Sequence, residues 1–186
     1  MKTIDYYLSP SSPWTYLGHA RFAAIAQKAG AGVSVKPVNY GVVFPQSGGL
    51  PLEKRAPQRQ AYRFQELKRW RDHLGVPLIL QPKHFPVDSA PAAQLIAGAP
   101  AERRMALAGD LLAAIWRDDK NIADPELLKA LGEKHGVSAP DKAGFEAYTQ
   151  EALGRGIFGA PSYVYKDEIF WGQDRLDFLE RALQRV

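Results

Sequence analysis

The stretch Ser12-Pro13-Trp14-Thr15-Tyr16-Leu17 decides the fold, because it marks the point where a strand gives way to a helix. Before it, residues 2–8 alternate apolar and polar side chains, which predicts a β-strand. Ser12 suits the capping position of a helix, and Pro13 suits its first turn. Residues 33–38 alternate again and predict a second strand. A strand, a helix and a strand joined by short connections favour a parallel pair.

The middle of the chain is predicted to be mostly helical. Residues 40–57 are rich in glycine and proline and are predicted to form a loop. Residues 76–87 are rich in proline and are predicted to be irregular and extended. Helices are predicted over residues 58–74, 89–98, 101–117, 124–136 and 142–154, with Tyr62, Leu67, Trp70 and Leu74 on the apolar side of the first.

The end of the chain returns to strands. Residues 162–165 and 169–171 flank a predicted hairpin turn, and a last helix is predicted from about Gly172 to Gln184. The element order is therefore β-α-β, a block of helices, and then β-β-α. This order predicts an α/β, thioredoxin-like fold with an inserted all-helical domain. The expected bounds are residues 1–40 and 158–186 for the thioredoxin-like domain and 41–157 for the helical insertion.

The composition limits the chemistry more than the fold. The 186 residues include no cysteine, which excludes disulfides, thiolate metal sites and dithiol redox chemistry by the protein itself. If the turn at Ser12 is catalytic, the sulfur must come from a bound thiol such as glutathione. The net charge of +4 suits an anionic small molecule, and the absence of a basic cluster argues against nucleic acid. We expect no metal site, no membrane span and a cytoplasmic location, because the start of the chain lacks an apolar signal segment.

A helix that begins at Ser12 has a direct chemical use. The N-terminus of a helix presents unpaired N–H groups and a partial positive charge, which stabilise an anion such as a thiolate. A hydroxyl that donates to that thiolate contributes on the order of 1.5–3 kcal/mol, which corresponds to about one to two pKa units. Two other interpretations stay open: Ser-Pro as an ordinary helix cap, and Ser12 as a covalent nucleophile with a histidine base. The four histidines show no triad context, and the chain has no Gly-x-Ser-x-Gly elbow.

Several segments together resemble a known family. The Ser12 stretch resembles the active-site turn of the DsbA-like superfamily, and more closely that of the 2-hydroxychromene-2-carboxylate isomerases and the kappa-class glutathione transferases. Those families carry Ser-Pro, an aromatic residue, Ser or Thr, and Tyr-Leu at this place. The other matching segments are Tyr62-x-x-x-Glu66-Leu67-Lys68-Arg69-Trp70, Gly75-Val76-Pro77-Leu78, Pro82-Lys83-His84-Phe85-Pro86, Phe158-Gly159-Ala160-Pro161 and Trp171-Gly172-Gln173-Asp174-Arg175-Leu176.

The resemblance implies a glutathione site. In it, Ser12 would hydrogen-bond the glutathione sulfur, and Ala160, before a cis Pro161, would pair with the cysteinyl unit as an added strand. Gln173 and Asp174 would bind the γ-glutamyl end. Without the resemblance, Pro161 would simply end a loop and Asp174 would simply start a helix.

The resemblance is less complete on the other side of the predicted site. Arg59 occupies the place of a lysine that contacts glutathione in the kappa class, although it also fits an exposed basic face. No asparagine occupies the best-aligned place in the loop Ser47-Gly48-Gly49-Leu50-Pro51, so any glutathione contact there would come from backbone groups. The residue that holds the substrate carboxylate is left open among Arg59, Arg63 and Lys83.

The implied activity is a glutathione-dependent cis–trans isomerisation in aromatic degradation. It would interconvert 2-hydroxychromene-2-carboxylate and trans-o-hydroxybenzylidenepyruvate, with a small aromatic carboxylate as substrate and glutathione as cofactor. Two alternatives stay open: a kappa-like glutathione transferase or peroxidase with a broader electrophile range, and a non-catalytic thioredoxin-like binding module. A homodimer agrees with the resemblance, but no sequence feature demands one.

Overall fold

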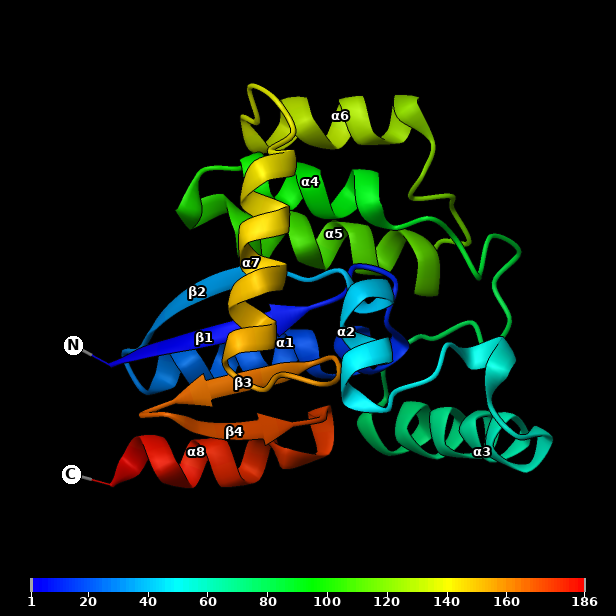
Figure 1. Ribbon diagram of the computed structural model, residues 1–186, viewed down its shortest axis with the longest axis horizontal. Helices are drawn as coiled ribbons and strands as arrows, with labels where there is room; N and C mark the ends of the chain where they lie inside the picture. Colours follow the sequence, from blue (N-terminus) through cyan, green and yellow to red (C-terminus); the bar gives the residue numbers. More distant parts are fainter. Residues whose placement is uncertain (1, 186) are drawn as a thin grey trace.

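A four-stranded mixed sheet forms the centre of the computed structural model, which describes residues 2–185. Its strands are β1 (Thr3–Leu8), β2 (Gly32–Pro37), β3 (Ser162–Tyr165) and β4 (Glu168–Trp171), in the spatial order β2-β1-β3-β4 (Figure 1). The predicted parallel pairing of β1 with β2 is confirmed. β3 runs antiparallel to both of its neighbours. As a result, β1 ends, β3 begins and β4 ends at the same side of the sheet.

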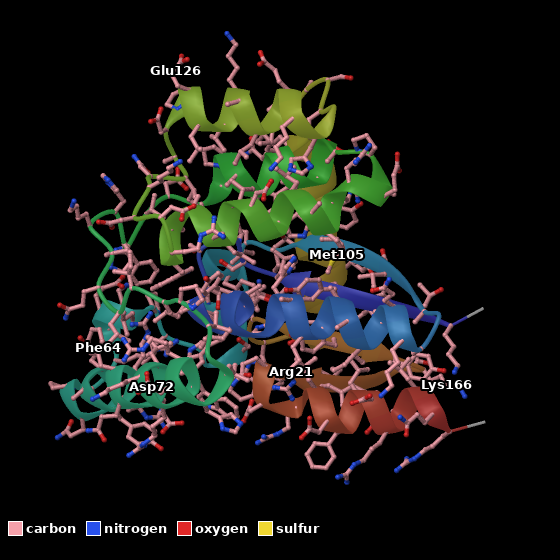
Figure 2. All side chains as sticks on the ribbon, turned by 180° about the vertical axis from the view of Figure 1, so that it is seen from behind. Arg21, Phe64, Asp72, Met105, Glu126 and Lys166 are labelled. Atoms are coloured by element: carbon pink, nitrogen blue, oxygen red, sulfur yellow. The ribbon has the colours of Figure 1, made fainter. Side chains whose placement is uncertain are left out.

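Helices cover both faces of this sheet. α1 (Pro13–Lys28) and α8 (Leu176–Gln184) lie on one face (Figure 2), and α7 (Lys142–Gly154) crosses the other (Figure 1). The remaining helices are α2 (Tyr40–Ser47), α3 (Pro57–Leu74), α4 (Ala90–Gly98), α5 (Arg104–Trp116) and α6 (Pro125–His135), with 3₁₀ turns η1 (Leu52–Lys54), η2 (Ala101–Arg103) and η3 (Gln173–Arg175). The predicted order of β-α-β, a block of helices and then β-β-α is therefore confirmed. Within residues 2–185, none of the helices has the length and hydropathy that crossing a membrane requires. The predicted domain bounds at residues 1 and 186 lie outside the described residues.

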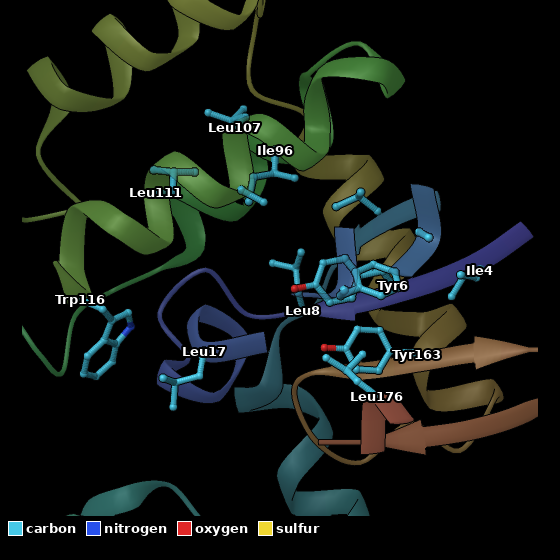
Figure 3. Close-up of a cluster of buried hydrophobic side chains, with 14 of the residues drawn as sticks. Ile4, Tyr6, Leu8, Leu17, Ile96, Leu107, Leu111, Trp116, Tyr163 and Leu176 are labelled. Atoms are coloured by element: carbon cyan, nitrogen blue, oxygen red, sulfur yellow. The ribbon is translucent and has the colours of Figure 1, made fainter. Parts of the chain in front are cut away.

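Alternation along the strands divides the buried side chains into two layers. On the α1 face, Tyr6 and Tyr163 stack with ring centroids 5.2 Å apart (Figure 3). On the opposite face, Tyr7 and Val164 pack with Val43 of α2. Since Tyr6 and Tyr7 are both fully buried, β1 is covered on both sides. The sheet is therefore a rigid frame for the loops at its ends.

The prediction of a loop over residues 40–57 is wrong for the first half of that range. Residues 40–47 form α2, because Asn39 caps the helix by accepting a hydrogen bond from the Gly41 N–H at 3.0 Å. Gly48 ends the helix with a positive φ of 74°, a conformation that suits glycine. Pro45 lacks one backbone donor but does not break this short helix. The predicted apolar side of α3 also needs one correction, since the Tyr62 side chain is exposed.

An ion-pair network ties α7 to the sheet. The Lys36 ammonium on β2 lies 2.8 Å from Asp5 Oδ1 and 2.6 Å from Glu151 Oε1 of α7. The Tyr7 hydroxyl donates to the same Glu151 oxygen at 2.7 Å, and Arg155 contacts Asp5 Oδ2 at 2.6 Å. Burial and the bond to Glu151 raise the pKa of Tyr7 to about 12. Burial opposes the charge of Lys36, but its bonds to the two carboxylates outweigh that effect and raise its pKa.

Candidate active site

Three turns meet at one end of the sheet, where α1 begins (Figure 1). β3 starts at Ser162, which pairs with Tyr7 of β1 on one side and with Trp171 of β4 on the other. The turn before Ser162 therefore lies beside the end of β1, and the turn after Trp171 lies next to it. The Gly172 N–H donates to the Pro161 carbonyl at 2.9 Å and joins these two turns. The structure thus brings the predicted site segments at Ser12, Ala160-Pro161 and Gln173-Asp174 to the same end of the sheet.

Ser12 caps α1, and two donors at this helix end have no acceptor among residues 2–185. Its Oγ accepts a hydrogen bond from the Thr15 N–H at 3.2 Å, and its carbonyl accepts one from the Tyr16 N–H at 3.0 Å. Pro13 has no N–H, and the Trp14 N–H has no partner among residues 2–185. The Ser12 hydroxyl proton is not used by these bonds. This end of α1 therefore offers one O–H and one N–H to an anion, together with the positive end of the helix.

The Ala160–Pro161 bond is cis, as predicted, and hydrogen bonds to the preceding residue fix the loop that contains it. The Gly159 carbonyl accepts hydrogen bonds from the Tyr40 hydroxyl at 3.0 Å and from Ser162 Oγ at 2.7 Å. Ala160 is half-buried, and neither its N–H nor its carbonyl has a partner within residues 2–185. Such a free backbone edge is able to pair with an extended peptide.

The two residues after Gly172 point in different directions. Gln173 is only 2% exposed, and its side chain packs beneath α1, where a Cβ on Gly18 would lie 2.7 Å from Gln173 Cβ. Its Oε1 is buried without a hydrogen-bond partner. Asp174 is exposed, and its Oδ2 accepts a hydrogen bond from Arg175 at 2.7 Å. Of this predicted pair, the structure therefore leaves only the Asp174 carboxylate open to a ligand.

Arg59 is the predicted site residue that the structure does not join to the others. It lies exposed in the first turn of α3, where its N–H donates to the Ala56 carbonyl at 2.9 Å. α3 packs against α1, but no described contact links Arg59 to the Ser12 turn. Its role therefore depends on the resemblance alone.

Tyr40 is a residue of this site that sequence reasoning missed. It belongs to α2, which the sequence analysis treated as loop, so nothing predicted that it would contact the cis-proline turn. The sequence signal that predicts α2 is a capping residue, Asn39, and a C-terminal glycine, Gly48, which are separated by the eight residues of the helix.

Within residues 2–185, no histidine hydrogen-bonds to Ser12, whose Oγ contacts only the Thr15 N–H. His19, on α1, hydrogen-bonds with the Tyr6 hydroxyl at 3.1 Å and with the Met105 carbonyl at 3.0 Å, so both of its ring nitrogens are occupied. Burial also lowers the pKa of His19. His135 lies 2.7 Å from Asp110 in the helical block. The covalent-nucleophile interpretation of Ser12 therefore has no support in this geometry. In the part of the chain that the structure describes, no three His, Asp or Glu side chains are placed to hold a metal.

Comparisons with known proteins agree with this architecture. The model of a family described as the DSBA-like thioredoxin domain matches residues 3–184. Among solved structures, a 2-hydroxychromene-2-carboxylate isomerase superposes with a TM-score of 0.82 at 25% identity, over 97% of this chain and 94% of that one.

Two curated relatives match nearly end to end. A 2-hydroxychromene-2-carboxylate isomerase of Sphingobium xenophagum is 29% identical over 193 residues, which cover 98% of each chain. The human glutathione S-transferase kappa 1 is 23% identical over 211 residues, which cover 98% of this chain and 91% of the relative. The resemblance inferred from the motifs therefore extends across the full length of the chain.

Proposed function

Because the chain belongs to the family of DSBA-like thioredoxin domains, we propose that it is a glutathione-dependent cis–trans isomerase of the 2-hydroxychromene-2-carboxylate isomerase type. In this proposal it interconverts 2-hydroxychromene-2-carboxylate and trans-o-hydroxybenzylidenepyruvate in aromatic degradation. The observation that carries the proposal is the start of α1. A serine hydroxyl and a free backbone N–H stand there, in a chain without cysteine.

The residues of the site fit glutathione. A tripeptide with a thiol and an amino-acid end needs an anion-stabilising helix start, a backbone edge and a carboxylate for its ammonium group. Ser12 and the Trp14 N–H supply the first, the free backbone groups of Ala160 supply the second, and the exposed Asp174 supplies the third. When bound, glutathione would supply the thiol that adds reversibly to the conjugated double bond of the substrate.

Each protein group then has a defined task. The Ser12 hydroxyl donates a hydrogen bond at the place where the thiol ionises, which favours the charged form by about one to two pKa units. Tyr40 and Ser162 hold the Gly159 carbonyl, which fixes the Ala160 edge against which a peptide would align. Asp174 binds the ammonium end, and a contact from Arg59 of α3 rests on the family resemblance alone. Gln173 supports the turn from below, since its side chain is buried against α1.

A second candidate is a glutathione transferase with a broader electrophile range, which the similarity to the human kappa-class enzyme favours. The two activities differ in the fate of the thiol. An isomerase returns glutathione after every turnover, whereas a transferase consumes one molecule for each conjugate formed.

Product analysis tests the proposal. Purified protein is incubated with the cis substrate and a small fraction of one equivalent of glutathione, and both isomers and free thiol are measured over time. We expect complete conversion with no loss of thiol. Conversion that stops when glutathione is used up, with a stable conjugate present, would identify the transferase instead. A lack of any glutathione-dependent conversion, together with no glutathione binding, would leave the non-catalytic binding module.

The proposal also includes a location and an assembly. Glutathione is kept reduced in the cytosol, so we propose that the enzyme acts in the cytoplasm. We include assembly as a homodimer, which light scattering of the purified chain tests by a mass of twice 20.6 kDa.

A further inference from the structure

Arg63 on α3 is a buried charge without a counter-ion. The residue is 8% exposed, and its guanidinium lies 5.3 Å from the ring centre of Phe85, 5.7 Å from that of Phe64 and 6.0 Å from that of Trp116. Among residues 2–185, it has neither a hydrogen-bond acceptor nor an ion-pair partner. The Arg63 nitrogens are not among the fully buried polar atoms that lack a partner, so the guanidinium still reaches solvent and is able to pair with an anionic ligand.

Two other groups of the chain, a hydrogen-bond donor and a second positive charge, would also favour a bound anion. The indole Nε1 of Trp116 is buried and has no hydrogen-bond acceptor within the described part of the chain. Burial, followed by the nearby positive charge of Arg55, lowers the pKa of Arg63 to about 10, so the guanidinium is still charged at neutral pH. The charged groups that act on Arg63 therefore include a second cation and no carboxylate.

The other basic candidates for a carboxylate ligand are in different situations. Lys83 is exposed and already paired, with its Nζ 3.4 Å from Asp119 Oδ2 and its backbone N–H donating to Asp119 Oδ1 at 2.7 Å. Arg59 is exposed. Arg63 lies one helical turn after Arg59, so the two residues share a face of α3.

The side chains that contact the Arg63 guanidinium are aromatic. The Phe85 and Trp116 rings are 5.0 Å apart. Trp116 belongs to the same buried cluster as Leu17 of α1, and Figure 3 shows the two on neighbouring segments. Phe64, next to Arg63 on α3, is labelled in Figure 2. The charged group is thus connected by packing to the helix that Ser12 caps.

We propose that Arg63, assisted by Arg55 and the Trp116 indole, binds the carboxylate of a conjugated aromatic acid, and that the aromatic side chains around it receive the apolar part. This inference deepens the proposed function and rests on it, since it assigns the carboxylate end of the substrate. The guanidinium fork matches a carboxylate through two parallel hydrogen bonds. Glutathione is held elsewhere, at Ser12, Ala160 and Asp174.

Calorimetric titration of the full-length protein separates the two sites. The probes are cinnamate, its uncharged analogue cinnamamide, and glutathione. The variants are Arg63→Met, which keeps the aliphatic stem, Arg63→Lys, which keeps the charge without the fork, and Lys83→Met as the matched control. For Arg63→Met we expect cinnamate to bind about 10- to 100-fold more weakly, with an unchanged affinity for glutathione. Arg63→Lys is expected to fall between wild type and Arg63→Met, and Lys83→Met to bind both probes like wild type.

Each outcome is informative. Because Arg63 has no ion-pair partner and methionine keeps an apolar stem against the surrounding rings, the thermal midpoint of Arg63→Met is expected to stay close to that of wild type, which shows that weaker binding does not come from misfolding. A preference of wild type for cinnamate over cinnamamide that disappears in Arg63→Met supports the carboxylate site. Equal cinnamate affinity in wild type and Arg63→Met, or no cinnamate binding by wild type, would overturn it. Cinnamate binding through Arg63 without any glutathione binding would overturn the proposed function and leave the carboxylate site standing.

Discussion

Replacing Lys36 by methionine is expected to destabilise the fold by about 3 kcal/mol or more, because two carboxylates lose the ammonium group that they share. The structure sets this magnitude. Lys36 is 8% exposed and lies within 2.8 Å of both Asp5 and Glu151. Arg155 remains 2.6 Å from Asp5 but is 3.9 Å from Glu151, so it replaces the lost ammonium only in part. The variant therefore leaves Glu151 with the Tyr7 hydroxyl and little opposing charge.

The assay is thermal unfolding at neutral pH, with Lys28→Met as the matched control. A loss of 3 kcal/mol corresponds to a fall in the midpoint of about 6–12 °C for a chain of this size. Lys28 pairs with Glu180 at the same distance of 2.8 Å, but its side chain is 73% exposed, so its removal is expected to change the midpoint little. If Lys36→Met lowers the midpoint no more than Lys28→Met does, the network does not stabilise the fold and our reasoning about it is wrong.

Two further predictions concern tyrosines that hold the frame of the site. The pKa of Tyr7 is raised to about 12 in the folded protein, above the unfolded value of about 10. The stability that the protonated Tyr7 contributes is therefore complete below about pH 10 and is lost as the pH rises toward 12. Denaturant unfolding over this pH range should show a steeper loss of stability for wild type than for Tyr7→Phe, and parallel curves would contradict the prediction. Tyr40→Phe removes one of the two donors to the Gly159 carbonyl. Chemical unfolding should show a loss of about 1 kcal/mol in stability, and calorimetry should show weaker glutathione binding. Unchanged binding would show that the cis-proline turn does not need this bond.

Much of the fold could be predicted because its signals are local. Alternation in residues 2–8 and 33–38, a capping serine and an N1 proline are properties of neighbouring residues, and together they predicted the parallel β1–β2 pair. The helix α2 was missed because the glycine and proline content of residues 40–57 indicates a loop, although one proline does not break a helix of two turns. Tyr62 was assigned to the apolar side of α3 from spacing alone, whereas neighbouring elements decide which face is covered.

The candidate site was predictable only as a set of segments. The family resemblance implied that Ser12, the cis-proline turn and Asp174 belong to one site, and the strand pairing brings these segments to one end of the sheet. The direction of a side chain is a property of tertiary packing, so the burial of Gln173 against Gly18 could not be inferred from its position after a glycine. The same applies to Arg63, whose lack of a partner becomes visible only when the surrounding side chains are in place.

The most direct test of the account is a pH titration of the thiol of bound glutathione, followed by the ultraviolet absorbance of the thiolate. Wild type is compared with Ser12→Ala, and Ser12→Thr serves as the control that keeps the hydroxyl. We predict a thiol pKa in wild type that is about one to two units lower than in Ser12→Ala, with Ser12→Thr near wild type. The same pKa in all three proteins, or no thiolate near neutral pH in wild type, would contradict the claim that Ser12 activates a borrowed thiol.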